Sequence, residues 1–174
     1  NCIQLGDKAG YLYCIIRDGK TNTYGYTGGC LTPGIWAHVA MVYDGTKLTN
    51  EEKLKLYING EQRSLTFNGN IPAVGPTTSS PLAISTIEYD GGNFSGYIDE
   101  VRVWKAALDG ATIKSYINTP IDNNHTNYSN LIANYSIKSI TDHQITNSAT
   151  GGANGHLLAN IATAKPNPLG STVN

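Results

Sequence analysis

The stretch NFSGYIDEVRVWKAALDGATIKSYI, residues 93–117, decides the fold class of this chain. Residues 94–104 are rich in β-branched and aromatic side chains, and this composition predicts a strand. Residues 108–117 form the one convincing helical segment of the sequence, with Asp109 at the position of an N-cap. A strand followed by one short helix, in a chain otherwise made of strands and turns, indicates an all-β sandwich.

The adjacent carboxylates Asp99 and Glu100 lie inside this expected strand and raise the question of an active site. Neighbouring residues of a strand point to opposite faces, so this pair is not expected to act as a facing acid and base. The alternation of apolar residues breaks at the pair, which predicts a β-bulge. We expect both carboxylates to serve the structure, by binding backbone N–H groups or by pairing with Arg102 or His38.

Short strands separated by turn residues account for most of the remaining chain. Asn59-Gly60 is a strong type I′ turn signal and predicts a hairpin. The strand before this turn directs Leu54, Leu56 and Ile58 toward the core, because these residues alternate with polar ones. The other expected strands are residues 10–17, 23–30, 35–44, 61–67, 81–86, 131–137 and 145–148.

The composition favours a secreted β-protein. Charged residues make up 14% of the 174 residues, against about 25% in an average globular protein, and 11 tyrosines outnumber 2 phenylalanines. The net charge is −1 and the basic residues are scattered, so neither nucleic acid nor an acidic membrane is an expected partner. No apolar run is long enough to span a bilayer. We expect an extracellular or cell-surface location, with any secretion signal outside this chain.

The three cysteines, Cys2, Cys14 and Cys30, show no spacing typical of a zinc site. Their odd number leaves at least one thiol without a disulfide partner inside a monomer. Two interpretations stay open at this point. Either the cysteines are small buried hydrophobic residues of strands, or Cys2 and Cys14 form a disulfide across a strand pair.

Four motifs occur in the order and spacing of a known family. They are WAHVAMVYDG (residues 36–45), LYING (56–60), PLAI (81–84) and FSGYIDEVRVW (94–104), the last followed by a short helix. Over roughly residues 10–117 the chain thus resembles the laminin G-like and pentraxin-like domains, which are concanavalin A-like jelly rolls. The resemblance implies an all-β jelly-roll sandwich with one short helix. It is less informative about function, because this fold carries many binding roles.

The same resemblance suggests the domain boundaries. Residues 1–119 are expected to form the laminin-G-like sandwich, without the strands that normally precede the first hairpin of the family. Residues 120–174 are expected to be a linker and a tail, which either completes the sandwich or begins a further element. The linker, residues 121–132, is similar to linkers in surface proteins of Bacteroidetes. We therefore expect the chain to be part of a longer protein.

A calcium site is a further implication of the resemblance. Pentraxins carry an acidic loop just before the strand that corresponds to residues 94–104, and their calcium contacts the ligand directly. In this chain the corresponding loop contains Glu88 and Asp90, and Asp44 ends an earlier strand. Calcium is held by carboxylate and carbonyl oxygens, so these three residues are the candidate Ca²⁺ ligands. A solvated turn without metal is the alternative, and no other cofactor is expected.

The candidate ligand-binding residues are Tyr24, Tyr26, Tyr89 and Asn93, which lie in or beside expected loops. Sugar rings stack on exposed aromatic faces, while sugar hydroxyls pair with amide and carboxylate groups. For each tyrosine, an ordinary half-buried place in a strand is the alternative.

The expected function is non-catalytic recognition or adhesion, with a glycan as the first choice of partner and a surface protein as the second. A structural spacer within a larger protein is the alternative. A β-glucanase-type hydrolase is a third class, and it requires two carboxylates side by side on one face. The expected strands supply no such pair.

Overall fold

The computed structural model describes residues 2–19, 21–77, 79, 81–84, 94–137, 140 and 142–157. These residues form two compact units. The first, called the sandwich unit here, is built from the described parts of Asn1–Leu82 and Ala107–Thr119. The second, called the smaller unit, is built from the described parts of Ala83–Ala106 and Pro120–Ser171.

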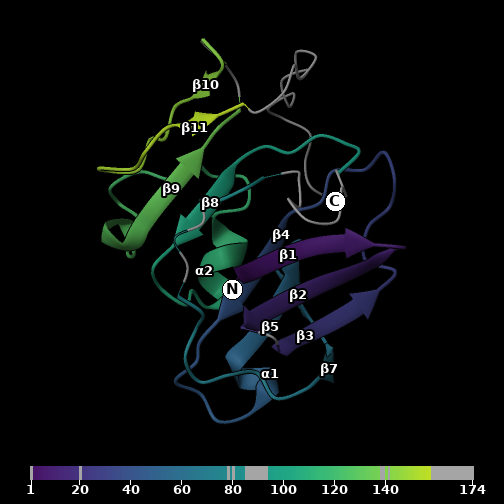
Figure 1. Cartoon of the computed structure of the whole chain (residues 1–174). Coiled ribbons are helices and arrows are strands. Elements are labelled where there is room, and N and C mark those ends of the chain that lie inside the picture. The colour runs from purple at the N-terminus through teal and green to yellow at the C-terminus, as the bar shows by residue number, and fades with distance from the viewer. Residues whose placement is uncertain are drawn as a thin grey trace. The chain divides into compact units, whose positions relative to one another are not determined.

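The sandwich unit contains a four-stranded antiparallel sheet in the order β1-β2-β3-β7, with β1, β2 and β3 drawn in purple to blue and β7 in teal in Figure 1. Residues of β2 alternate strictly between the two faces, with Leu12, Cys14 and Ile16 buried. The expected hairpin of residues 10–30 is thereby confirmed. The strands are β1 (Cys2–Lys8), β2 (Tyr11–Asp18), β3 (Thr21–Gly28) and β7 (Thr66–Asn68).

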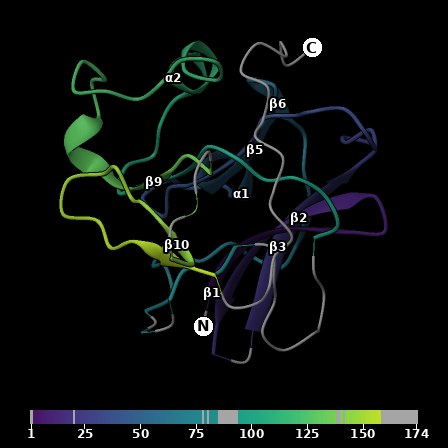
Figure 2. The same cartoon turned by 90° about the horizontal axis from the view of Figure 1, so that it is seen from above.

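A second antiparallel sheet, in the order β4-β5-β6, lies behind the first sheet in Figure 1 and beside it in Figure 2. The predicted inward residues Leu54, Leu56 and Ile58 are all buried and join the core of the first sheet. Asn59 and Gly60 both have positive φ, 51° and 79°, as a type I′ turn requires. These strands are β4 (Val39–Tyr43), β5 (Leu54–Ile58) and β6 (Glu61–Arg63).

Helix α2 (Gly110–Ser115) confirms the expected helix, although it is shorter than residues 108–117. Asp109 is the N-cap, and its carboxylate accepts a hydrogen bond of 2.7 Å from the backbone N–H of Thr112. That hydrogen bond lowers the pKa of Asp109. The helix begins against β5, because the position of a Cβ on Gly110 would lie 2.8 Å from the ring of Tyr57. The predicted cap therefore anchors the helix on the second sheet.

Two elements of the sandwich unit were not predicted. The strand β1 pairs along its whole length with β2, in the register Leu5↔Cys14. The one-turn helix α1 (Asn50–Lys53) lies outside residues 108–117, the one segment expected to be helical. Thr49 and Glu52 form a capping box around its first turn, so the sequence TNEE carried the signal for this helix.

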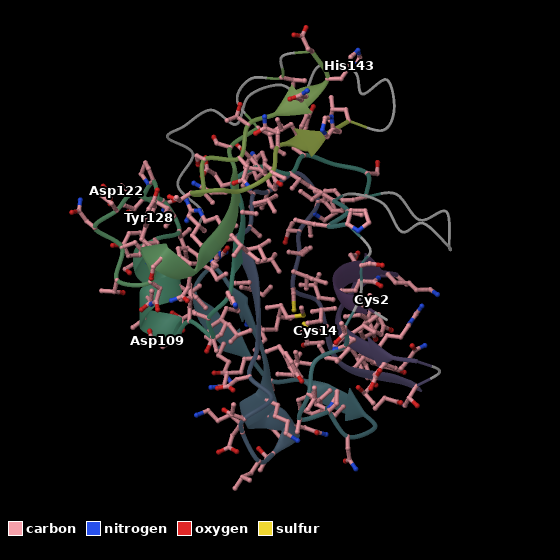
Figure 3. The ribbon with its side chains drawn as sticks, turned by 60° about the vertical axis from the view of Figure 1, so that its left-hand side comes forward. Cys2, Cys14, Asp109, Asp122, Tyr128 and His143 are labelled. Atoms are coloured by element: carbon pink, nitrogen blue, oxygen red, sulfur yellow. The ribbon has the colours of Figure 1, made fainter. Side chains whose placement is uncertain are left out.

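The interpretation of Cys2 and Cys14 as a disulfide is wrong. The register places Cys2 opposite Arg17, on the face away from the core, whereas Cys14 points inward and is fully buried. The two side chains therefore lie on opposite faces of the sheet, and Figure 3 shows them apart. All three cysteines, Cys30 included, are free thiols. Burial raises the pKa of the Cys14 thiol to about 12, which makes it a buried hydrophobic residue, as the other interpretation predicted.

The smaller unit contains two strand pairs. Within the expected strand 94–104, only the last four residues form strand β8, and its partner β9 confirms part of the strand expected over residues 131–137. The strand expected over residues 81–86 is not seen at 81–84, and its last two residues lie outside the described residues. The elements of this unit are β8 (Val101–Trp104), η1 (Tyr128–Asn130), β9 (Leu131–Tyr135), β10 (Gln144–Ile145) and β11 (Gly155–His156).

Candidate functional site

The Asp99-Glu100 pair forms a structural corner. One carboxylate oxygen of Asp99 accepts hydrogen bonds from the backbone N–H groups of Glu100 and Ile137, both at 2.8 Å. Glu100 has a positive φ of 53°, which turns the chain just before β8 begins. Its carboxylate lies 3.1 Å from the guanidinium of Arg102, a side chain that is only 11% exposed. Both predicted roles, binding backbone N–H groups and pairing with Arg102, are confirmed.

Asp44 follows β4, and its carboxylate forms hydrogen bonds within the turn that it begins. Its Oδ1 accepts hydrogen bonds from the hydroxyl and the backbone N–H of Thr46, at 2.6 and 3.1 Å. The hydroxyl contact is the main reason that the pKa of Asp44 lies below its usual value. Lys47 lies 3.8 Å away and adds a weak, exposed ion pair. This environment is that of a solvated turn.

The remaining candidate residues of the acidic loop, Glu88, Tyr89, Asp90 and Asn93, lie outside the described residues. Within the described part of the chain, no group of three or more His, Cys, Asp or Glu side chains is placed to hold a metal ion. The calcium site therefore stays a prediction.

Tyr24 and Tyr26 lie in the middle of β3, not in or beside loops as expected. Their rings join those of Tyr11 and Tyr13, which sequence reasoning missed. Tyr13 stacks on Tyr26 with ring centroids 5.5 Å apart and planes 18° apart. Tyr13 also lies 5.7 Å from Tyr24, and Tyr11 lies 6.0 Å from Tyr26. Four tyrosines from two strands thus form one continuous aromatic cluster.

We call the surface around this cluster the tyrosine face. It is the side of the four-stranded sheet opposite the core, since the four tyrosines alternate with the buried residues of β2 and β3. Tyr11 is 45% exposed, and the other three tyrosines are half-buried. The rings are therefore reachable by a ligand from one side.

Two glycines shape the tyrosine face. Gly6 is the register partner of Tyr13, and Gly28 is the register partner of Tyr11. The ring of Tyr11 occupies the space beside Gly28, since a Cβ there would lie 2.7 Å from the ring. The absence of a side chain at Gly28 therefore allows the ring of Tyr11 to lie against the sheet.

Three amide side chains belong to the same face of the sheet as the rings. By register, Gln4 of β1 pairs with Ile15 of β2, and Asn68 of β7 pairs with Tyr24. Asn22 of β3 pairs with Arg17 of β2. The primary amides of Gln4, Asn22 and Asn68 each offer both a donor and an acceptor of hydrogen bonds. Aromatic rings flanked by amides are the chemistry that sugar recognition uses.

A second candidate lies in the smaller unit, around His125. The imidazole is 3% exposed and stacks on Trp104, with ring centroids 4.5 Å apart. Its Nδ1 accepts a hydrogen bond of 3.0 Å from the backbone N–H of Asn127. Burial lowers the pKa of His125, and the nearby Arg102 lowers it further, so the imidazole is neutral near pH 7. The open hollow beside it is lined by Asn123, Thr126, Tyr128, Ser129, Leu131 and Thr150.

The comparison with known families decides the identity of the domain. A family model described as the concanavalin A-like lectin/glucanases superfamily, of the laminin G type, matches residues 3–114. The chain belongs to this superfamily. The all-β jelly-roll fold expected from the sequence is thereby confirmed, and the match begins within β1, the strand that was not predicted.

No curated protein and no solved structure matched the chain. Among the described residues, no helix is long and apolar enough to cross a membrane. The similarity of residues 121–132 to linkers of Bacteroidetes surface proteins stays a prediction. The superfamily name covers both lectins and glucanases, so the match shows a fold of the carbohydrate-binding type and does not by itself assign a function.

Proposed function

We propose that this concanavalin A-like domain is a non-catalytic carbohydrate-binding module that acts outside the cell or at its surface. The observation that carries the proposal is the tyrosine face, where four rings from β2 and β3 lie within 6.0 Å of a neighbour. The C–H groups of sugar rings pack on such aromatic surfaces, and the flanking amides can bind sugar hydroxyls.

The distribution of carboxylates supports binding over hydrolysis. A glycosidase needs two carboxyl groups facing one another across the bound sugar. In the four strands of the tyrosine face, all of whose residues are described, Asp7 and Asp18 occupy positions on the core side. No Asp or Glu stands among the residues that these strands direct to the tyrosine face. A ligand on this face would be held without being cleaved.

The direct test is affinity gel electrophoresis of the whole chain through soluble polysaccharides, namely β-glucan, xylan, mannan and polygalacturonate. Retardation by at least one of them supports the proposal. Equal migration in all gels and in a gel without polysaccharide contradicts it, and would favour the structural spacer.

Tyr13 is the most informative residue for mutation, because it contacts both Tyr24 and Tyr26. We expect Tyr13→Ala to weaken polysaccharide binding roughly tenfold, since an aromatic contact contributes up to about 1.5 kcal/mol. Tyr13→Phe keeps the ring and should retain most of the affinity.

Tyr97→Ala is the matched control, because Tyr97 is 59% exposed and lies in the smaller unit. Circular dichroism confirms that each variant is folded. If Tyr13→Ala and Tyr97→Ala bind equally well, the tyrosine face is not the binding surface.

A further inference from the structure

The charged side chains on the tyrosine face indicate the chemical class of its ligand. We propose that this face binds an anionic polysaccharide, one that carries uronate carboxylates or sulfate esters along its chain. Lys8 and Arg17 are the residues that recognise the charges. This inference rests on the proposed function and adds the chemistry of the ligand to it.

Lys8 and Arg17 stand on the same face as the tyrosines. The register pairs Lys8 with Tyr11, at one end of the aromatic cluster. Arg17 follows Ile15 on the same face of β2, at the other end, where it pairs with Asn22. The two basic residues therefore bracket the four rings, and no carboxylate of these fully described strands shares the face with them. A negative ligand would meet attraction at both ends and no repulsion between them.

Arg17 is held in position for this role. Its Nε donates a hydrogen bond of 2.6 Å to Oδ1 of Asn22 on the adjacent strand. Nε is the guanidinium nitrogen bonded to the aliphatic part of the side chain, so this contact does not use the two terminal nitrogens. A guanidinium fork matches the two oxygens of a carboxylate or a sulfate, so a fixed fork loses less entropy on binding. Asn22 is thus a positioning residue for Arg17.

The separation of the charges favours a polymer over a single sugar. Tyr11, the register partner of Lys8, and Arg17 are six residues apart on β2, which corresponds to roughly 20 Å along a strand. One monosaccharide cannot reach both ends of this distance. A polysaccharide with a repeated negative charge reaches both basic residues while its rings lie over the tyrosines between them.

The test uses the whole chain and three soluble polysaccharides: polygalacturonate, chondroitin sulfate and a neutral β-glucan. Dissociation constants are measured by isothermal titration calorimetry at about 20 mM and about 500 mM NaCl, because salt screens exposed charges. We expect an anionic polymer to bind at low salt and to bind several-fold more weakly at high salt. Chondroitin sulfate carries uronate carboxylates as well as sulfate esters. Binding to polygalacturonate, with or without chondroitin sulfate, therefore assigns the carboxylate, and binding to chondroitin sulfate alone assigns the sulfate. Either result supports the proposal.

The double variant Lys8→Gln/Arg17→Gln should bind the anionic polymer roughly tenfold more weakly, since each exposed ion pair contributes a modest share. The matched control is Lys47→Gln/Arg63→Gln. It removes the same charge from the sandwich unit, at positions outside the four strands of the tyrosine face. The control should bind as tightly as the unmodified chain.

Three results would overturn the proposal, and they have different consequences. If neutral β-glucan binds as tightly as the anionic polymers, and the Lys8/Arg17 double variant is unaffected, the ligand class is wrong although the proposed function stands. If both double variants weaken binding equally, or if Tyr13→Ala leaves it unchanged, the attraction is unspecific. If none of the three polymers binds, the inference fails, and the affinity gels with xylan and mannan decide whether the proposed function fails with it.

Discussion

Replacing Leu56 with alanine is expected to lower the free energy of unfolding of the sandwich unit by about 2–5 kcal/mol. Leu56 is fully buried in β5 and belongs to the cluster that joins the two sheets. Truncation removes apolar contact and leaves a cavity, because β-strands on both sides prevent the site from collapsing. Urea denaturation followed by circular dichroism measures the change.

Leu48→Ala is the control for this prediction. The chemical change is identical, but Leu48 is 88% exposed in the loop before α1. An exposed truncation of this kind should change the free energy of unfolding by no more than about 0.5 kcal/mol. Equal losses in the two variants would show that Leu56 does not lie in a packed core.

The second large effect is expected at Asp99, in the smaller unit. Asp99→Ala removes the acceptor for two backbone N–H groups, those of Glu100 and Ile137. Hydrogen bonds to a charged group are stronger than neutral ones, and half-buried donors left without a partner are costly. We expect a loss of about 2–3 kcal/mol in the free energy of unfolding. Amide hydrogen exchange at Ile137 should become faster in the same variant.

Two further variants distinguish the contributions of the Asp99 and Glu100 carboxylates to stability. Asp99→Asn keeps an oxygen at the same place and should lose about 1 kcal/mol, because the acceptor is no longer charged. Glu100→Ala removes the ion pair with Arg102 and leaves Asp99, the acceptor of both backbone hydrogen bonds, in place. Unchanged exchange at Ile137 in Asp99→Ala would contradict the structural role of this carboxylate.

Local sequence patterns predicted the structure correctly where it depends only on the residues of one element and its adjoining turn. The alternation of Leu54, Leu56 and Ile58 predicts the buried face of β5, and Asn59-Gly60 predicts the turn that follows. Asp109 predicts the start of α2, because an N-cap carboxylate needs only its neighbours in the chain. These predictions depend on residues within a few positions of one another.

The strand β1 shows why other predictions failed. Its core-side residues Ile3 and Leu5 are 48% and 39% exposed, and β1 lies at the edge of its sheet. A strand with little buried apolar surface carries a weak alternating pattern, so its pairing with β2 decides its structure.

The tyrosine face could not be predicted from the sequence for a related reason, because it depends on the pairing of two strands. Tyr24 and Tyr26 were selected as single residues, whereas the site depends on the register that places Tyr13 opposite Tyr26. The sequence contains two tyrosines at alternate positions in each strand, which shows that they share a face within a strand. Only the pairing of β2 with β3 shows that the two sets form one surface.

The buried thiol of Cys14 gives this sandwich an internal reporter of its own opening. An alkylating reagent attacks the thiolate, and Cys14 is both fully buried and protonated, with a pKa near 12. Cys2 and Cys30 are only half-buried. Modification of Cys14 therefore requires the two sheets to separate, and its rate in the native protein reports how often they do so. Cys14 thus allows the opening of the core to be followed in the natural sequence, without a cysteine introduced by mutation.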